Sequence, residues 1–248
     1  MKIGITERGD AGLDLSWFDK LSTVNGTILI TKNIRDIFIE KVIQAVNNNH
    51  KIIVHCTCTG WGTSVVEPNV PLYAEQLNNL KKLISKGFPI ENCVLRIDPI
   101  IPTKSGLKQV ENLIKYTYSI GLLPKIRVRI SILDEYKHVK NRIKDVGFQP
   151  FYVSSFQAPK SMIEATYNTL SKFNIKYETC AEPMLNSYDI FEKQGCISEK
   201  DLKIMELSNM NQSVNPQNRN GCLCLSCKTE LLTNAHQCMH GCLYCYWH

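Results

Sequence analysis

The cysteines with the most informative spacing lie in the segment CMHGCLYC, which spans residues 238–245. Cys238, Cys242 and Cys245 form a C-x3-C-x2-C array, and Gly241 supplies backbone freedom directly before the middle cysteine. Structural zinc sites usually have C-x2-C or C-x4-C pairs and four ligands, so this triad fits them poorly. Three thiolates can instead hold three corners of a 4Fe-4S cluster, which leaves one iron without a protein ligand and free to bind a substrate.

The remaining cysteines fall into two groups. The chain has 11 in all, many for a protein in a reducing compartment, where grouped thiols more often indicate metal or redox chemistry than disulfides. Cys56, Cys58 and Cys93 lie in apolar surroundings, and we expect them in the core. The other eight all lie at or beyond Cys180, so the grouped thiols are confined to the C-terminal part of the sequence.

Length and composition indicate one globular, soluble domain. The 248 residues are 44% hydrophobic and 21% charged, which favours neither disorder nor a membrane protein. No apolar run reaches the ~18 residues of a spanning helix, and the first residues lack the apolar core of a signal peptide, so we expect a cytoplasmic protein. The net charge of +6 permits an anionic partner such as nucleic acid, although simple solubility explains it equally well.

Short apolar, β-branched runs alternate with segments that carry apolar residues at helical intervals. The runs predict seven strands, at 2–6, 27–32, 51–59, 93–100, 125–133, 151–155 and 175–182. The intervening patterns predict helices at 34–46, 72–84, 106–119, 160–173 and 199–207. Such alternation is typical of a parallel sheet, either doubly wound or closed into a barrel.

We predict an α/β fold built on a complete or partial (β/α) TIM-like barrel, because no Gly-rich phosphate loop follows the first strand as a dinucleotide fold would require. The barrel is expected over residues 1–207. Residues 208–248 are expected to form a loop and a Cys-rich tail, packed on the barrel mouth as part of the same structural unit. Barrel enzymes gather catalytic groups at the carboxyl ends of strands, where the sequence places Glu7, Arg8, Asp98, Ser155 and Glu182.

Polar residues alternate along three predicted strands and therefore share one face of the sheet. Charges beneath packed helices would be poorly placed, so we expect this face to line a polar cavity; alternatively, some of these residues are strand ends that emerge into loops. The face comprises His55, Thr57 and Thr59, then Arg96 and Asp98, then Arg127, Arg129 and Ser131. Its arginines suit a phosphate or carboxylate. The predicted cofactor or substrate contacts are its charged members, Arg96, Asp98, Arg127 and Arg129.

The triad, with Tyr244 immediately before its last cysteine, resembles the signature of the radical S-adenosylmethionine (SAM) superfamily. This resemblance implies that Cys238, Cys242 and Cys245 hold a 4Fe-4S cluster whose open iron binds SAM, with Tyr244 near the adenine. It also implies reductive cleavage of SAM to a 5′-deoxyadenosyl radical that abstracts hydrogen from a substrate. An electron donor such as flavodoxin or ferredoxin would then be a partner. The superfamily's fold is a full or partial (β/α) barrel.

Most members of that superfamily carry the triad near the N-terminus, whereas this chain resembles an uncharacterised family that ends in a segment like CxHGCxYCYA. The likeness extends weakly through ERGD (7–10), LRIDPIIPT (95–103), TCAE (179–182) and GCISEKDL (195–202), and so covers most of the chain. It implies a permuted barrel in which the C-terminal tail carries the cluster loop to the barrel mouth.

The same resemblance implies a second metal centre in the tail. Four cysteines correspond to cysteines of that family and would ligate either a second iron-sulfur cluster or zinc: Cys180, Cys196, Cys222 and Cys224, with Cys227 as an alternative. The substrate is left open, with a nucleotide or nucleic acid allowed by the charge. The alternative to an enzyme is a zinc-stabilised α/β module that binds nucleic acid or protein without catalysis.

Overall fold

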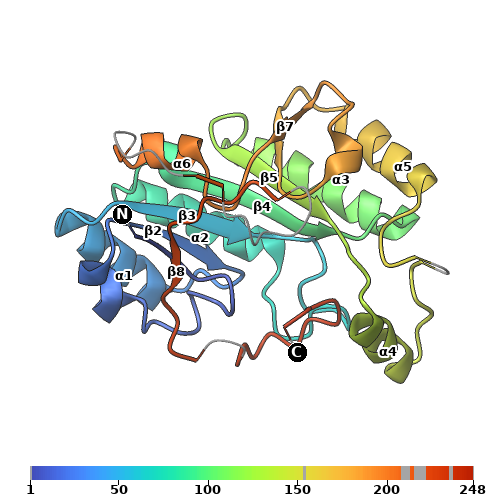
Figure 1. The fold of residues 1–248 in the computed structure, drawn as a ribbon, viewed down its shortest axis with the longest axis horizontal. Helices are drawn as coiled ribbons and strands as arrows, with labels where there is room; N and C mark the ends of the chain where they lie inside the picture. Colours follow the sequence, from blue (N-terminus) through green and yellow to red (C-terminus); the bar gives the residue numbers. More distant parts are fainter. Residues whose placement is uncertain (1, 153–154, 208–212, 215–221, 235–236, 248) are drawn as a thin grey trace.

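A computed structural model describes residues 2–152, 155–207, 213–214, 222–234 and 237–247. Its centre is a single sheet of eight parallel strands in the order β7-β6-β5-β4-β3-β2-β1-β8 (Figure 1). The strands are β1 (Ile3–Ile5), β2 (Gly26–Thr31), β3 (Ile52–Thr57), β4 (Cys93–Ile100), β5 (Arg127–Ile132), β6 (Tyr177–Thr179), β7 (Phe191–Lys193) and β8 (Lys228–Glu230). The α-helices are α1 (Asp36–Asn47), α2 (Tyr73–Ser85), α3 (Lys104–Ser119), α4 (Lys137–Asp145), α5 (Lys160–Leu170) and α6 (Glu199–Ile204). Short 3-10 helices span Phe18–Thr23, Ile90–Asn92 and Pro183–Leu185.

The central strands form where the chain is apolar and β-branched. Every residue of β2 and of β3 is buried, as expected for parallel strands covered on both faces. All seven strand pairs are parallel, so the carboxyl ends of the strands meet at one edge of the sheet. This edge is where a site is expected in such a fold.

Alternate residues of the strands contribute to two separate apolar clusters, one on each face of the sheet. The larger cluster joins strand residues such as Cys56 and Leu95 to the buried faces of helices α1, α2, α3 and α5. The smaller cluster joins Ile28 and Ile53 to Leu202 of α6 and to residues that precede β8. The polar residues of β3, β4 and β5 therefore face away from the main helix layer, and Cys56, Cys58 and Cys93 lie in the core, as predicted.

The predicted parallel α/β sheet is confirmed, and six of the seven predicted strands overlap an observed one. The described residues of the predicted strand 151–155 do not form a strand; residues 153–154 lie outside the described part of the chain. The backbone N–H groups of Phe151 and Tyr152 donate to the Glu135 carboxylate at 2.7 and 2.9 Å. The Glu135 side chain thus accepts from backbone N–H groups that would donate to a neighbouring strand if this segment belonged to the sheet.

The sheet is open: among the described strands, β7 and β8 form its two edges and do not pair with each other. A closed TIM-like barrel is therefore not formed. Helix α4 lies beside the C-terminal segment in Figure 1, and its Val139 and Ile143 pack in one apolar cluster with Cys242 and Tyr244. No helix in the described ranges is long and apolar enough to cross a membrane.

Candidate metal and cofactor site

A cavity of about 440 Å³ lies at the carboxyl edge of the sheet, large enough for a small-molecule ligand. Its wall includes Glu7 and Arg8 after β1, Lys32 after β2, and the carboxyl ends of β4 and β5. Parallel strands present polar side chains from consecutive loops at this edge, so residues far apart in the sequence meet here.

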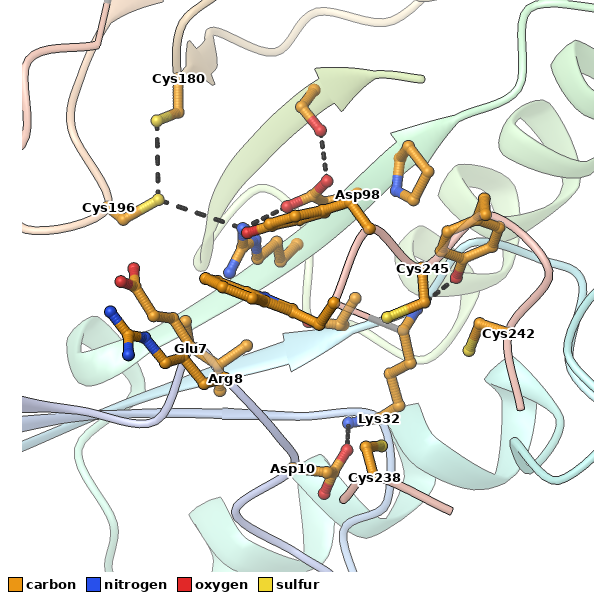
Figure 2. Close-up of a pocket in the computed structure, with 18 of the residues that line it drawn as sticks. Glu7, Arg8, Asp10, Lys32, Asp98, Cys180, Cys196, Cys238, Cys242 and Cys245 are labelled. Carbon is orange, nitrogen blue, oxygen red and sulfur yellow. Dashed lines mark hydrogen bonds and ion pairs between the residues drawn. The ribbon is translucent and has the colours of Figure 1, made fainter. Parts of the chain in front are cut away.

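Seven cysteines line this single cavity, in two groups. Figure 2 shows Cys180 and Cys196 on one side and Cys242 and Cys245 on the other. The first group is Cys180, Cys196, Cys222 and Cys224, and the second is the triad Cys238, Cys242 and Cys245. The structure therefore brings together the residues predicted for both metal centres.

The triad loop is held through its backbone. Arg142 of α4 donates from its two terminal nitrogens to the carbonyl oxygens of Cys242 and Cys245, at 3.1 and 2.7 Å. Gly241 has a φ of +65°, a left-handed conformation that glycine adopts without steric cost. Because these contacts use the backbone, the thiols remain available to bind a ligand.

The side chain of His240 also holds the triad loop in place. Its Nε2 lies 2.8 Å from the Asp10 carboxylate and its Nδ1 lies 3.1 Å from the Asn69 carbonyl oxygen. The ring is thus held between a carboxylate and a carbonyl oxygen from two other parts of the chain. Asp10 also accepts from the Thr31 hydroxyl and the Lys32 backbone N–H, each at 2.6 Å. Burial favours a raised pKa for Asp10, but the hydrogen bond and charge of His240 outweigh it and lower the pKa below its ordinary value.

A buried network holds Tyr244. Lys32 Nζ lies 2.8 Å from the Glu67 carboxylate and 2.8 Å from the Tyr244 hydroxyl, which itself donates to Glu67. Thr59 donates to the second Glu67 oxygen at 2.7 Å. Burial acts to raise the pKa of Glu67, yet attraction to Lys32 is strong enough to lower it below its ordinary value of 4.5. These contacts fix the Tyr244 ring at the cavity wall and place a positive charge beside Cys242.

Replacing Glu67 by Gln is expected to lower the free energy of unfolding by about 2 kcal/mol at neutral pH, a value typical for hydrogen bonds to a charged group. Because the folded-state pKa of Glu67 is lowered, its contribution is complete above the ordinary value of 4.5 and is lost as the pH falls through the folded-state value. Urea unfolding of wild type and variant over a pH series measures this difference. The exposed Glu164, which pairs with Lys160 four residues away, supplies the control variant Glu164→Gln. A difference that stays constant down to the lowest pH would contradict the assignment.

Of the four charged residues predicted as contacts, Arg96 and Asp98 line the cavity. They form an ion pair, and Asp98 also accepts from the Ser131 hydroxyl. Burial acts to raise the pKa of Asp98, but the positive charge of Arg96 outweighs it and lowers the pKa. Arg96 also lies 4.0 Å from the Cys196 sulfur, which connects this ion pair to the first thiol group.

The structure does not bring Arg127 or Arg129 to the lining of this cavity. Arg127 lies 2.8 Å from Asp201 of α6, and the buried Arg129 lies 2.7 Å from Glu178 of β6. Arg129 also approaches Asp201, at 3.5 Å. These guanidinium groups are therefore occupied in ion pairs that hold α6 against the sheet.

The first thiol group is compact. The sulfur atoms of Cys180, Cys196 and Cys224 all lie within 4.8 Å of one another, and those of Cys180 and Cys196 are 3.5 Å apart. Cys222 contacts the thiols of Cys180 and Cys224. Hydrogen bonds from the neighbouring thiols, that of Cys180 first, hold the pKa of Cys224 well below its ordinary value. Cys227, the predicted alternative, lies instead in the smaller apolar cluster and does not line the cavity.

The residues predicted at strand ends have different environments. Glu7 and Arg8 line the cavity. Ser155 does not, and its hydroxyl donates to the Gln157 carbonyl oxygen. Glu182 accepts from the backbone N–H of Ile132 at 2.8 Å, an interaction that fixes the end of β5.

Sequence reasoning missed the roles of Asp10, Lys32 and Glu67. The available signals were the positions of Lys32, one residue past β2, and of Asp10, five residues past β1. Both positions follow the carboxyl ends of strands. Nothing in the local sequence marks Glu67, since its partners Lys32 and Tyr244 lie 35 and 177 residues away.

The comparison with protein families identifies one match. The model of a domain of unknown function, DUF1848, matches residues 18–247, which is most of the chain and includes both thiol groups. No curated protein matches the chain. The chain therefore belongs to the DUF1848 family, a family of unknown function whose model covers strands β2 to β8 and the Cys-rich tail.

Proposed function

We propose that this protein is a radical SAM enzyme, in which Cys238, Cys242 and Cys245 hold a 4Fe-4S cluster and the cavity accepts SAM and a substrate. The observation that carries the proposal is that all three thiols of a C-x3-C-x2-C triad line one cavity at the carboxyl edge of a parallel sheet. When bound, such a cluster supplies the electron that cleaves SAM to a 5′-deoxyadenosyl radical, which abstracts hydrogen from the substrate.

The triad residues suit this group. In the described part of the chain, their three sulfur atoms do not form a tight set within 4.8 Å of one another, as those of Cys180, Cys196 and Cys224 do. A cubane cluster binds each thiolate at a different corner, which requires a wider spacing than a single ion does. Lys32 lies close enough to Cys242 for their charges to interact, and would partly neutralise a negatively charged cluster.

Other cavity residues would orient SAM. The Tyr244 hydroxyl is held by Lys32 and Glu67, which leaves the ring in a fixed position to contact the adenine. Arg96 and Asp98 present a positive and a negative group to the cavity, as recognition of the amino and carboxylate groups of SAM requires. Arg142 and His240 would act only by positioning the triad loop.

The open parallel sheet is compatible with a partial barrel whose C-terminal tail brings the cluster loop to its mouth. A flavodoxin or ferredoxin would deliver the electron, in the reducing cytoplasm. The substrate class is open; the net charge of +6 is compatible with a nucleotide or nucleic acid.

The direct test is formation of 5′-deoxyadenosine. Protein purified without oxygen, reconstituted with iron and sulfide and reduced with dithionite, is expected to convert SAM to methionine and 5′-deoxyadenosine in equal amounts, measured by liquid chromatography and mass spectrometry. Unreduced protein is the control. If reconstituted, reduced protein formed no 5′-deoxyadenosine, the assignment as a radical SAM enzyme would be overturned. Zinc bound at the triad would favour a non-catalytic module that binds nucleic acid or protein.

A further inference from the structure

The compact thiol group is assembled from three separate parts of the chain. Cys180 follows β6, Cys196 follows β7, and Cys222 and Cys224 precede β8. Two backbone contacts bring these parts together: the Cys196 N–H donates to the Cys224 sulfur at 3.1 Å, and the Leu225 N–H donates to the Ile197 carbonyl oxygen at 3.2 Å. The thiols therefore meet where the segment after β7 contacts the segment before β8.

The spacing of these thiols discriminates between the metal groups that they could hold. A zinc ion bound to sulfur at about 2.3 Å in a tetrahedron separates its thiolates by about 3.8 Å. The Cys180 and Cys196 sulfurs are 3.5 Å apart, and Cys224 lies within 4.8 Å of both. A 4Fe-4S cube would hold its thiolates farther apart, each on its own iron.

We propose that Cys180, Cys196, Cys222 and Cys224 bind a single zinc ion, which joins the segment after β7 to the segment before β8. Four thiolates fill the coordination shell, so this zinc is structural, although it borders the same cavity as the triad.

The surroundings suit a negatively charged tetrathiolate centre. Zinc with four thiolates carries two negative charges, and the Arg96 guanidinium lies 4.0 Å from the Cys196 sulfur. The buried Arg129 donates to the Cys196 carbonyl oxygen at 3.2 Å. Gly195 allows the close approach that the site needs, because a Cβ there would lie 2.7 Å from the Leu223 carbonyl oxygen and 2.8 Å from Cys224 backbone atoms.

Metal analysis of matched variants tests the proposal without relying on activity. A chain in which the triad cysteines are replaced by alanine is expected to retain about one zinc ion and no iron or sulfide after aerobic purification. Adding Cys224→Ser to that chain should remove the zinc. The control is Cys227→Ser in the same chain, because Cys227 lies three residues away but outside the thiol group, and it should leave the zinc content unchanged.

If the Cys224→Ser chain does not fold, metal exchange in the triad-alanine chain provides a second test. The triad-alanine chain, freed of metal by a chelator and titrated with cobalt(II), should develop the intense visible bands of a tetrahedral thiolate site, which added zinc then removes. Iron and sulfide bound to these cysteines, octahedral cobalt spectra or unchanged zinc in Cys224→Ser would each overturn the proposal. Because the triad is absent from these chains, the result is independent of the proposed SAM chemistry.

Discussion

Replacing Cys238, Cys242 and Cys245 together by alanine is expected to abolish formation of 5′-deoxyadenosine. The three thiols are the only protein ligands proposed for the catalytic cluster, and their loss removes its attachment to the cavity wall. The expected result is loss of triad-bound iron and sulfide, together with product at the level of the no-enzyme control. Iron analysis and mass spectrometry of the reaction measure the two effects.

The triad-alanine chain is expected to stay folded, because the loop is held by contacts that do not involve sulfur. Arg142 binds the loop's carbonyl oxygens, and His240 binds Asp10 and Asn69. Circular dichroism of this chain checks the fold, and Cys227→Ala, at a residue that does not line the cavity, is the matched control for losing a cysteine. Product formation that survives loss of all three thiols would contradict the assignment.

Replacing Arg129 by Met is expected to lower the free energy of unfolding by about 3–5 kcal/mol, the range observed when one partner of a buried ion pair is removed. Arg129 is 1% exposed and pairs with Glu178 and Asp201, whose side chains are 3% and 0% exposed. Methionine fills similar space but leaves both carboxylates with less compensating charge in a poorly hydrated environment.

Urea unfolding at neutral pH measures the effect of Arg129→Met, and Lys82→Met serves as its control. Lys82 pairs with Asp36 on the surface, where both side chains are about half exposed or more, so its removal is expected to cost at most about 1 kcal/mol. If both variants lost equally little stability, the network around Arg129 would not be holding α6 to the sheet.

The core of the fold could be predicted because β2 to β5 are long, apolar and β-branched, and helices α1, α2 and α3 carry apolar residues at helical spacing. Strands β7 and β8 were missed because each has only three residues, two of which are charged, whereas the equally short β1 is fully buried and apolar. Closure of the sheet depends on these two short strands, so an open sheet could not be distinguished from a barrel. Helix α4 was not predicted because it is short and rich in Lys and Arg, and its buried face consists of only two apolar residues, Val139 and Ile143.

The candidate site could be predicted where its chemistry is local in the sequence. The triad was recognisable from spacing within eight residues, whereas the environment of Lys32 depends on Glu67 and Tyr244, 35 and 212 residues away. Arg127 and Arg96 have the same alternation in their strands, and sequence could not show that one meets Asp201 and the other the cavity. Which face of a sheet a residue occupies follows from period two, but its partner there follows from tertiary packing.

The most direct test of the central claim is electron paramagnetic resonance of the reconstituted, dithionite-reduced protein, recorded before and after addition of SAM. The proposal predicts the signal of a reduced 4Fe-4S cluster whose g-values and shape change when SAM binds the open iron. A well-reconstituted protein that gives no reduced-cluster signal, or one whose signal is indifferent to saturating SAM, would contradict it.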